Sequence, residues 1–260
     1  MLVGFKCPKD KENRKFDYCF NACSEHCHPT PLLYALSDQR EVTPGTFSVT
    51  EILKPFQQVH FERTCDFYRD PASMMWAVFG TAVHHVISSM ETRINGDFAI
   101  EVRFSVGIET PHGIATLRGT PDLYDKKKKI LWDFKVKPYF NALKFTLNKE
   151  FPLKELGDHY QLNLYRVWGQ PEAEKLKLCY IVRDHNKSVM REGVPPSLDR
   201  DVPIYNTKVM QDLTVERMTT HFACELGKQP PPECTTRDRW NGNKCGKYCG
   251  GSEHCPQYKR

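Results

Sequence analysis

The sequence predicts an α/β fold in which helices flank a mixed central sheet. With 260 residues, the chain is long enough to bury a substantial core. Period-two alternation over residues 98–108 and 175–183 indicates strands, and helical patterns lie before, between and after them. This order of helix, strands, helix, strand and helix is typical of a mixed sheet covered by helices.

Two helices are expected in the first third of the core. Residues 46–56 (TFSVTEILKPF) predict a short helix, because Ser48 and Glu51 have the spacing of a capping box. Residues 73–92 predict a longer helix with a recurring face that includes Gly80. Glycine is costly inside a helix, so this residue indicates a close approach to another part of the molecule.

The middle of the chain predicts three strands. Residues 98–108 form the first, and a turn at residues 111–113 leads to GTPDLYDKKKKILWDFKV, which reads as two strands joined by a tight turn. The later expected elements are a helix over 156–167, a strand over 175–183 and a helix over 207–227 that ends at a glycine.

Composition divides the chain into three segments. We expect a cysteine-rich N-terminal segment over 1–45, a core over 46–227 and a cysteine-rich C-terminal segment over 228–260, which begins with the proline-rich linker KQPPPEC. The first segment is polar and interrupted by prolines, so we expect its order to depend on a metal or on docking. The two terminal segments are expected to pack together as a metal-stapled appendage.

The net charge of +5 fits a polyanionic partner. No apolar run approaches the roughly 20 residues of a membrane helix, and MLVGFKCPKDKENRK lacks the apolar middle of a signal peptide. We therefore expect a cytoplasmic protein without a membrane partner. The oligomeric state is open.

The two strands of GTPDLYDKKKKILWDFKV carry the most informative residues of the chain. Alternation places Asp133, Lys135 and Lys137 on one face of the second strand. Charges beside a core are costly unless they lie at a solvent face or a strand end, or serve a site. With Asp122 on the first strand, two carboxylates on adjacent strands supply part of the oxygen shell that a hard divalent cation prefers.

Four ordered motifs resemble the PD-(D/E)XK nuclease superfamily, specifically its RecB-like branch, which includes CRISPR-associated adaptation exonucleases and many phage recombination nucleases. The motifs are GTAVH with Gly80 and His84, GTPD ending at Asp122, DFK from Asp133, and QLNLY with Gln161 and Tyr165. Each is common by chance, but their order makes the set specific.

The resemblance implies a restriction-endonuclease-like core and a metal-dependent DNA nuclease, most simply an exonuclease on single strands or duplex ends. It implies that Asp122, Asp133, the backbone carbonyl of Phe134 and His84 bind Mg²⁺ or Mn²⁺. The bound cation would activate a water for in-line attack on the phosphodiester. Lys135 would orient or deprotonate that water, or stabilise the developing charge.

The resemblance also implies that Gln161 and Tyr165, which share one helix face, hold the nucleic-acid strand or support the site. One alternative is a non-catalytic DNA-binding or scaffold protein of the same fold. Another is a nuclease subunit that works with a recombinase or an integrase. The implied setting is the cytoplasm of a bacterial or phage-infected host cell.

Eight of the eleven cysteines bracket the core, as metal ligands would. They are Cys7, Cys19, Cys23 and Cys27 at one end and Cys234, Cys245, Cys249 and Cys255 at the other. CGKYCGGSEHCP resembles the triplet that carries an iron-sulfur cluster in part of the RecB-like branch, although its first spacing has three intervening residues where the family usually has two. This implies one [4Fe-4S] cluster that staples both ends; two four-thiolate Zn²⁺ sites are the alternative.

Overall fold

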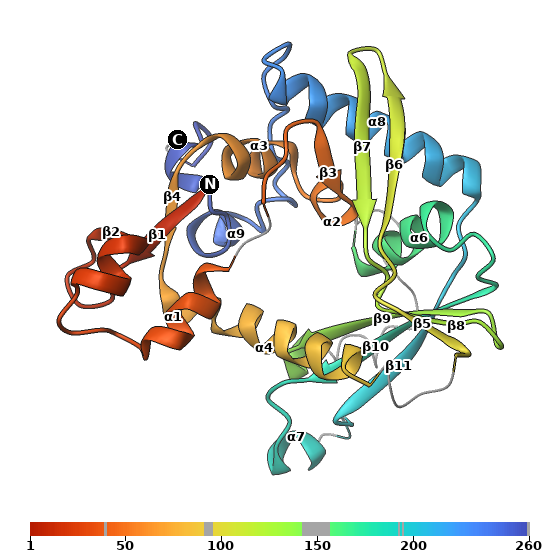
Figure 1. Ribbon diagram of the computed structural model, residues 1–260, viewed down its shortest axis with the longest axis horizontal. Coiled ribbons are helices and arrows are strands. Elements are labelled where there is room, and N and C mark those ends of the chain that lie inside the picture. The colour runs from red at the N-terminus through yellow and green to blue at the C-terminus, as the bar shows by residue number, and fades with distance from the viewer. Residues whose placement is uncertain (39–40, 91–95, 142–156, 192, 194, 259–260) are drawn as a thin grey trace.

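The computed structural model describes residues 1–38, 41–90, 96–141, 157–191, 193 and 195–258. It is a mixed α/β protein whose strands form a five-stranded central sheet and two three-stranded sheets, with helices around them (Figure 1). The coarse fold class expected from the sequence is therefore confirmed. Among the described residues, no helix combines the length and the apolar character needed to cross a membrane.

The central sheet contains the paired strands that the sequence predicts. In spatial order its strands are β11 (Ser197–Val202), β10 (Lys175–Val182), β9 (Ile130–Lys137), β8 (Leu123–Asp125) and β5 (Phe98–Ile100). β9 and β10 run parallel and the other pairs run antiparallel, which makes the sheet mixed. The turn over 126–129 joins β8 to β9 and brings Leu123 opposite Trp132.

A second sheet stands beside the first and consists of β3 (Thr46–Ser48), β7 (Gly113–Gly119) and β6 (Phe104–Thr110). The expectation of one strand over 98–108 is wrong. Glu101 has a φ of 48°, and its N–H donates to the Asp122 carbonyl at 3.1 Å. The left-handed residue turns the chain out of the central sheet, so β5 and β6 belong to different sheets.

The two expected core helices are present with different boundaries. The Ser48–Glu51 capping box forms, but α2 (Val49–Ile52) ends early and a separate α3 (Phe56–Thr64) begins after Pro55. α4 (Pro71–Ser88) begins two residues before the predicted start, because Asp70 caps it and Pro71 fits its first position. Residues 91–92 of the expected helix lie outside the described residues.

The expectation that Gly80 marks a close approach is wrong. A Cβ built on Gly80 meets no atom within 4 Å among the described residues. The helical pattern around it arises from half-buried positions on a helix of which only Pro71 is fully buried.

The remaining core helices cover the sheets and close the main hydrophobic cluster. They are α6 (Asp158–Trp168), α7 (Lys187–Arg191) and α8 (Thr207–Glu225). Asn206 caps α8, and Gly227 follows its end with a φ of 67°, so the glycine stop is confirmed. Leu131 and Leu178 of the sheet, Leu162 of α6 and Met218 of α8 are buried together in this cluster.

The N-terminal segment has more structure of its own than the sequence suggested. It contains β1 (Leu2–Lys6), β2 (Asn13–Lys15), the π-helix η1 (Tyr18–Ala22) and α1 (Thr30–Ser37), and β1 pairs with β4 (Phe67–Arg69). Phe5, Leu33 and Leu36 form a small core under it. These strands are too short to give a detectable alternation.

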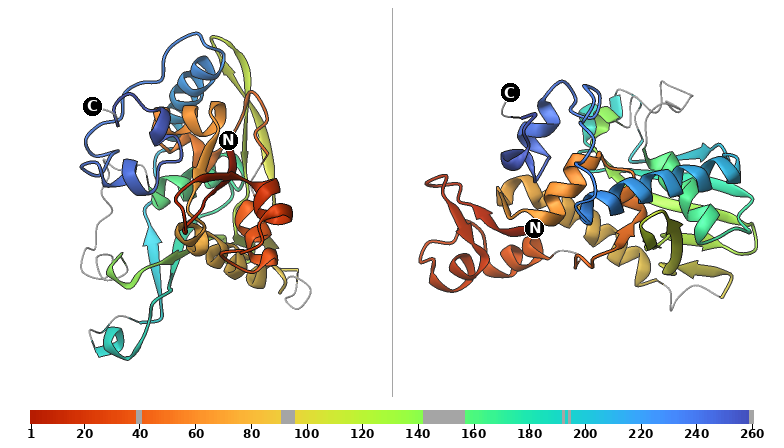
Figure 2. Two further views of the ribbon diagram at one scale, coloured as in Figure 1. Left: turned by 90° about the vertical axis from the view of Figure 1, so that its left-hand side faces the viewer. Right: turned by 90° about the horizontal axis from the view of Figure 1, so that it is seen from above.

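The C-terminal segment carries α9 (Asn243–Lys247) and η2 (Ser252–His254) and packs against α3 and β4. The side chain of Phe67 leaves room only for a glycine at Gly250, and the Arg69 side chain donates to the Tyr248 carbonyl at 3.1 Å. The N-terminal and C-terminal segments lie on different sides of this region, as both views in Figure 2 show.

Candidate active site

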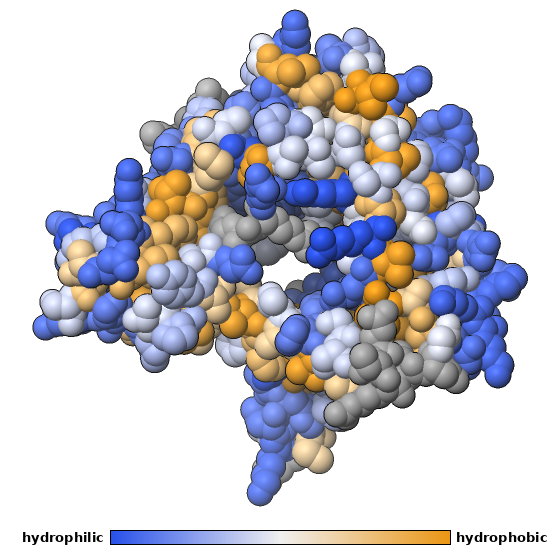
Figure 3. Space-filling model, in the orientation of Figure 1, coloured by the Kyte–Doolittle hydropathy of each residue, from blue (hydrophilic) through white to orange (hydrophobic). Residues whose placement is uncertain are grey.

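The candidate site is a cavity of about 1140 Å³ between α4 on one side and α2, β3, β6 and β7 on the other. Figure 3 shows the molecule hollowed at its centre, with hydrophilic side chains on the rim. The residues of all four motifs reach this cavity. His84, Gly119, Asp122, Asp133, Lys135, Gln161 and Tyr165 line it.

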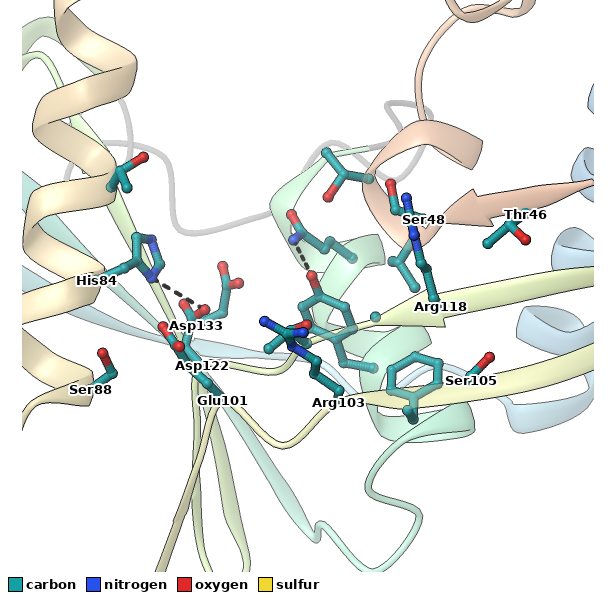
Figure 4. A pocket seen from close by; sticks show the side chains of 18 of the residues that line it. Thr46, Ser48, His84, Ser88, Glu101, Arg103, Ser105, Arg118, Asp122 and Asp133 are labelled. Carbon is teal, nitrogen blue, oxygen red and sulfur yellow. Dashed lines mark hydrogen bonds and ion pairs between the residues drawn. The ribbon is translucent and has the colours of Figure 1, made fainter. Parts of the chain in front are cut away.

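Two carboxylates from adjacent strands lie at the floor of the cavity. The register that pairs Leu123 with Trp132 places Asp122, directly before β8, beside Asp133 on β9. The Phe134 N–H donates to Asp122 Oδ2 at 2.7 Å, which fixes that side chain. Asp122 Oδ1 lies 3.3 Å from His84 Nδ1, so α4 contributes an imidazole to the same cluster (Figure 4).

Lys135 neutralises the buried carboxylate of Asp133. Its Nζ donates to Asp133 Oδ1 at 2.9 Å and lies 2.7 Å from Oδ2, without hydrogen-bond geometry to the latter. Two residues further along β9, the Lys137 Nζ lies 2.8 Å from Asp158 Oδ2 of α6. The expectation that Asp133, Lys135 and Lys137 share one face of their strand is confirmed.

Burial and neighbouring charges shift the titration of this cluster. Burial raises the pKa of Asp133, and Lys135 opposes that shift. Burial lowers the pKa of Lys135, but the carboxylates of Asp133, Asp158 and Asp122 outweigh it, so the pKa is raised. The hydrogen bond to Asp122 raises the pKa of His84 against the opposing effect of burial. The lysine is therefore a cation, while the carboxyl of Asp133 and the imidazole of His84 both take up a proton more readily than usual.

Gln161 and Tyr165 share one face of α6, as their spacing predicts. The Gln161 Nε2 donates to the Tyr165 Oη at 2.8 Å. Burial raises the pKa of the Tyr165 phenol, which is 6% exposed and so stays protonated. The amide of Gln161 thus lines the cavity and is held in place by its hydrogen bond to the buried Tyr165.

The glycine of GTPD has a packing role. A Cβ on Gly119 would lie 2.5 Å from Phe104 Cε1 and 2.9 Å from Tyr165 Cε1. The rings of Phe104 and Tyr165 meet edge to face at 6.3 Å between centroids. Gly119 therefore allows β7 to press against both rings where the motif residues begin.

Sequence reasoning missed the opposite wall of the cavity. Arg103 and Arg118 lie across from the carboxylates in Figure 4, and both line the cavity. Arg118 lies on β7 opposite Ser105, and Arg103 comes directly before β6. The hairpin register could have placed the two arginines near each other. The expectation of a single strand over 98–108 prevented that inference.

The side chains at the floor fit a hard divalent cation by their chemistry. Asp122 and Asp133 offer carboxylate oxygens, and His84 offers an imidazole nitrogen. Asp133 Oδ2 is a buried acceptor that receives no hydrogen bond. In the described part of the chain, no three His, Cys, Asp or Glu side chains converge closely enough to hold an ion, so a bound cation would require side-chain adjustment.

The eight terminal cysteines fall into two groups in the structure. Cys7, Cys23 and Cys27 are the thiols that act electrostatically on Cys19, whereas Cys245, Cys249 and Cys255 act on Cys234. The side chain of Gln257 ties the C-terminal group together by bonding both the N–H and the carbonyl of Cys234. The structure therefore groups the thiols by chain end.

Comparisons with known proteins bear on the fold alone. No protein-family model matches the chain, and no curated protein matches it. The crystal structure of a protein called SSO0001 is similar with a TM-score of 0.51 and 19% sequence identity, over 86% of this chain and 92% of that one. This similarity supports the mixed α/β arrangement across most of the chain.

Proposed function

We propose that this protein is a metal-dependent DNA nuclease with a restriction-endonuclease-like core of the RecB-like type. The observation that carries the proposal is the meeting of His84, Asp122, Asp133 and Lys135, from three separate elements, on one floor of one cavity. A structural role alone does not require four ionisable groups with opposed charges to line an open cavity, because surface ion pairs add little stability.

The proposed division of labour follows from the contacts. Asp122, Asp133 and His84, with the Phe134 carbonyl, hold Mg²⁺ or Mn²⁺, which when bound supplies an activated water and neutralises charge on the phosphate. Lys135 is held by Asp133 with its ammonium at the cavity floor. From there it orients the attacking water or stabilises negative charge that develops on the phosphate.

The opposite wall suits the backbone of a nucleic-acid strand. Arg103 is exposed, and no hydrogen bond or ion pair of its guanidinium involves another described residue. The Arg118 guanidinium donates to the Glu41 carbonyl at 2.9 Å, which orients it. Arginines bind phosphates with a planar fork of donors, so these two side chains are proposed to hold the strand while the carboxylates face the scissile bond.

The test is cleavage of labelled single-stranded and double-stranded DNA with Mg²⁺ or Mn²⁺. Wild-type protein is expected to cleave, and Lys135→Ala is expected to lose activity. Lys127→Ala is the matched control, because Lys127 is an exposed lysine at the tip of the same hairpin. Equal cleavage by wild type and Lys135→Ala, or no cleavage by wild type with either metal, contradicts the proposal.

A further inference from the structure

We propose that the chain carries two separate four-thiolate metal sites, one in each terminal segment, instead of a single cluster shared by both ends. The two groups are defined here as the N-terminal quartet (Cys7, Cys19, Cys23 and Cys27) and the C-terminal quartet (Cys234, Cys245, Cys249 and Cys255). This inference does not depend on the proposed nuclease function.

The N-terminal quartet belongs to one small structural unit. Cys7 opens the turn between β1 and β2, where its N–H donates to the Glu12 carbonyl at 2.8 Å. Cys19 lies on η1, and both Cys19 and Cys27 pack against the small core under β1. Cys7 and Cys23 act electrostatically on both of those thiols. The four thiols thus belong to the unit built around the β1–β2 hairpin, with Cys7 at its turn and the Cys19 Sγ next to the Arg14 carbonyl of β2.

The C-terminal quartet is equally local. Cys255 is buried, and its Sγ donates to Gln57 Oε1 of α3 at 3.2 Å. Gln257 ties Cys234 to the end of the segment through hydrogen bonds of 2.8 and 3.2 Å. Cys245 lies on α9 and Cys249 shortly after it, and the Cys249 N–H donates to the Lys244 carbonyl at 3.0 Å.

The sheet formed by β2, β1 and β4 lies between the two quartets. Leu2 pairs with Phe67, and the C-terminal segment contacts β4 on both sides of this pair. Gly250 packs on Phe67, the His254 ring nitrogen lies 2.7 Å from the Asp66 carbonyl, and the Tyr248 carbonyl accepts from Arg69 at 3.1 Å. Cys7 follows the opposite end of β1. Figure 2 accordingly places the blue C-terminal segment and the red N-terminal unit apart.

A shared centre requires all of its thiolates to lie close together. Zinc holds each thiolate sulfur at about 2.3 Å, so its four ligands lie within a few ångströms of one another. A four-iron cluster is larger, but it also requires thiolates around one compact core. Because each chain end supplies four thiols, each can close a complete site by itself. Forming either one needs cysteine side-chain rotations, since no three described thiols converge on a point.

Metal analysis of the full-length protein tests the inference. Zinc and iron are quantified per chain after anaerobic purification, and absorbance near 400 nm distinguishes an iron-sulfur cluster from zinc. We expect two centres per wild-type chain. Cys19→Ser/Cys23→Ser and Cys245→Ser/Cys249→Ser are each expected to lose one centre and to keep the other, while Cys179→Ser, outside both quartets, keeps two.

The opposite results are equally clear. A single centre in the wild-type protein overturns the inference without any variant, so a misfolded variant does not block the test. The loss of all metal from a soluble quartet variant also overturns it, because that result indicates a shared cluster. Neither outcome affects the DNA cleavage assay of the Lys135 variant, so the two proposals fail separately.

Discussion

Replacing Lys135 by alanine is expected to remove the proposed chemistry and to reveal the energetics of a buried carboxylate. The Lys135 Nζ lies 2.7 Å from Asp133 Oδ2, and the Asp133 side chain is only 1% exposed. At that distance two unit charges attract by about 6 kcal/mol in an effective dielectric constant of about 20. Desolvation offsets part of this, so removing the lysine alone is expected to lower the free energy of unfolding by about 3–5 kcal/mol.

This loss of stability depends on pH, because Asp133 can neutralise its buried charge by taking up a proton. Burial raises its pKa and Lys135 opposes the shift, so the pKa rises further in the variant. Between the wild-type and variant pKa values, the folded variant holds a proton that the unfolded chain has released. A raised folded-state pKa gives stability that is lost as pH rises. The difference from wild type therefore widens by about 1.4 kcal/mol per pH unit in that interval.

Urea unfolding at pH 6, 7, 8 and 9, beside single-turnover cleavage, measures both effects. Cleavage by Lys135→Ala is expected to fall by at least about 100-fold. Asp133→Asn/Lys135→Ala removes the charge together with its partner, so it is expected to be more stable than Lys135→Ala at pH 8 and equally inactive. A stability difference that stays constant from pH 6 to 9, or a double variant no more stable than the single one, refutes this account of the pair.

Three further outcomes are expected. His84→Ala should raise the Mn²⁺ concentration for half-maximal cleavage by at least about 10-fold at pH 8 and flatten its rise toward pH 6, since the raised pKa of His84 makes protons compete with the metal. Gly119→Ala should lower the free energy of unfolding by about 1–3 kcal/mol, because the added Cβ would lie 2.5 Å from a ring carbon of Phe104. Gly80→Ala should raise the free energy of unfolding by up to about 1 kcal/mol, because alanine favours the helix and its Cβ meets no described atom within 4 Å. Urea unfolding measures both. Arg103→Ala should weaken single-stranded DNA binding and reduce the slope of log affinity against log salt by about 0.7, and Lys208→Ala, on α8, should leave the slope unchanged.

The carboxylate floor could be predicted from the sequence because local rules determine it. Alternation along β9 sets Asp133 and Lys135 on one face, and the four-residue turn fixes the register that brings Asp122 beside Asp133. The boundary at Pro55 was harder to place, because a single apolar pattern runs through two short helices. Strands of three residues, such as those paired with β1, leave no period to detect.

The arginine wall could not be predicted, because it depends on one backbone conformation. A glutamate with positive φ has no sequence signal, and alternation continues across Glu101 since both flanking strands are half-buried. The same residue bonds its N–H to the Asp122 carbonyl, so the chain leaves the central sheet directly beside the carboxylates. Arg103 follows two residues later.

One continuous stretch of chain, from β5 through the β6–β7 hairpin to Asp122, therefore connects the arginine wall to the carboxylate floor. Phe104 starts β6, presses on Gly119 at the end of β7, and meets the Tyr165 ring on α6. These contacts pack the hairpin against α6 beside the cavity, so we expect them to help set the span from the arginine guanidinium groups to the carboxylates. A larger residue at Gly119 would alter that span without touching either charged group. Its effect on cleavage would then exceed its effect on metal affinity, which separates the geometry of the cavity from the chemistry of its floor.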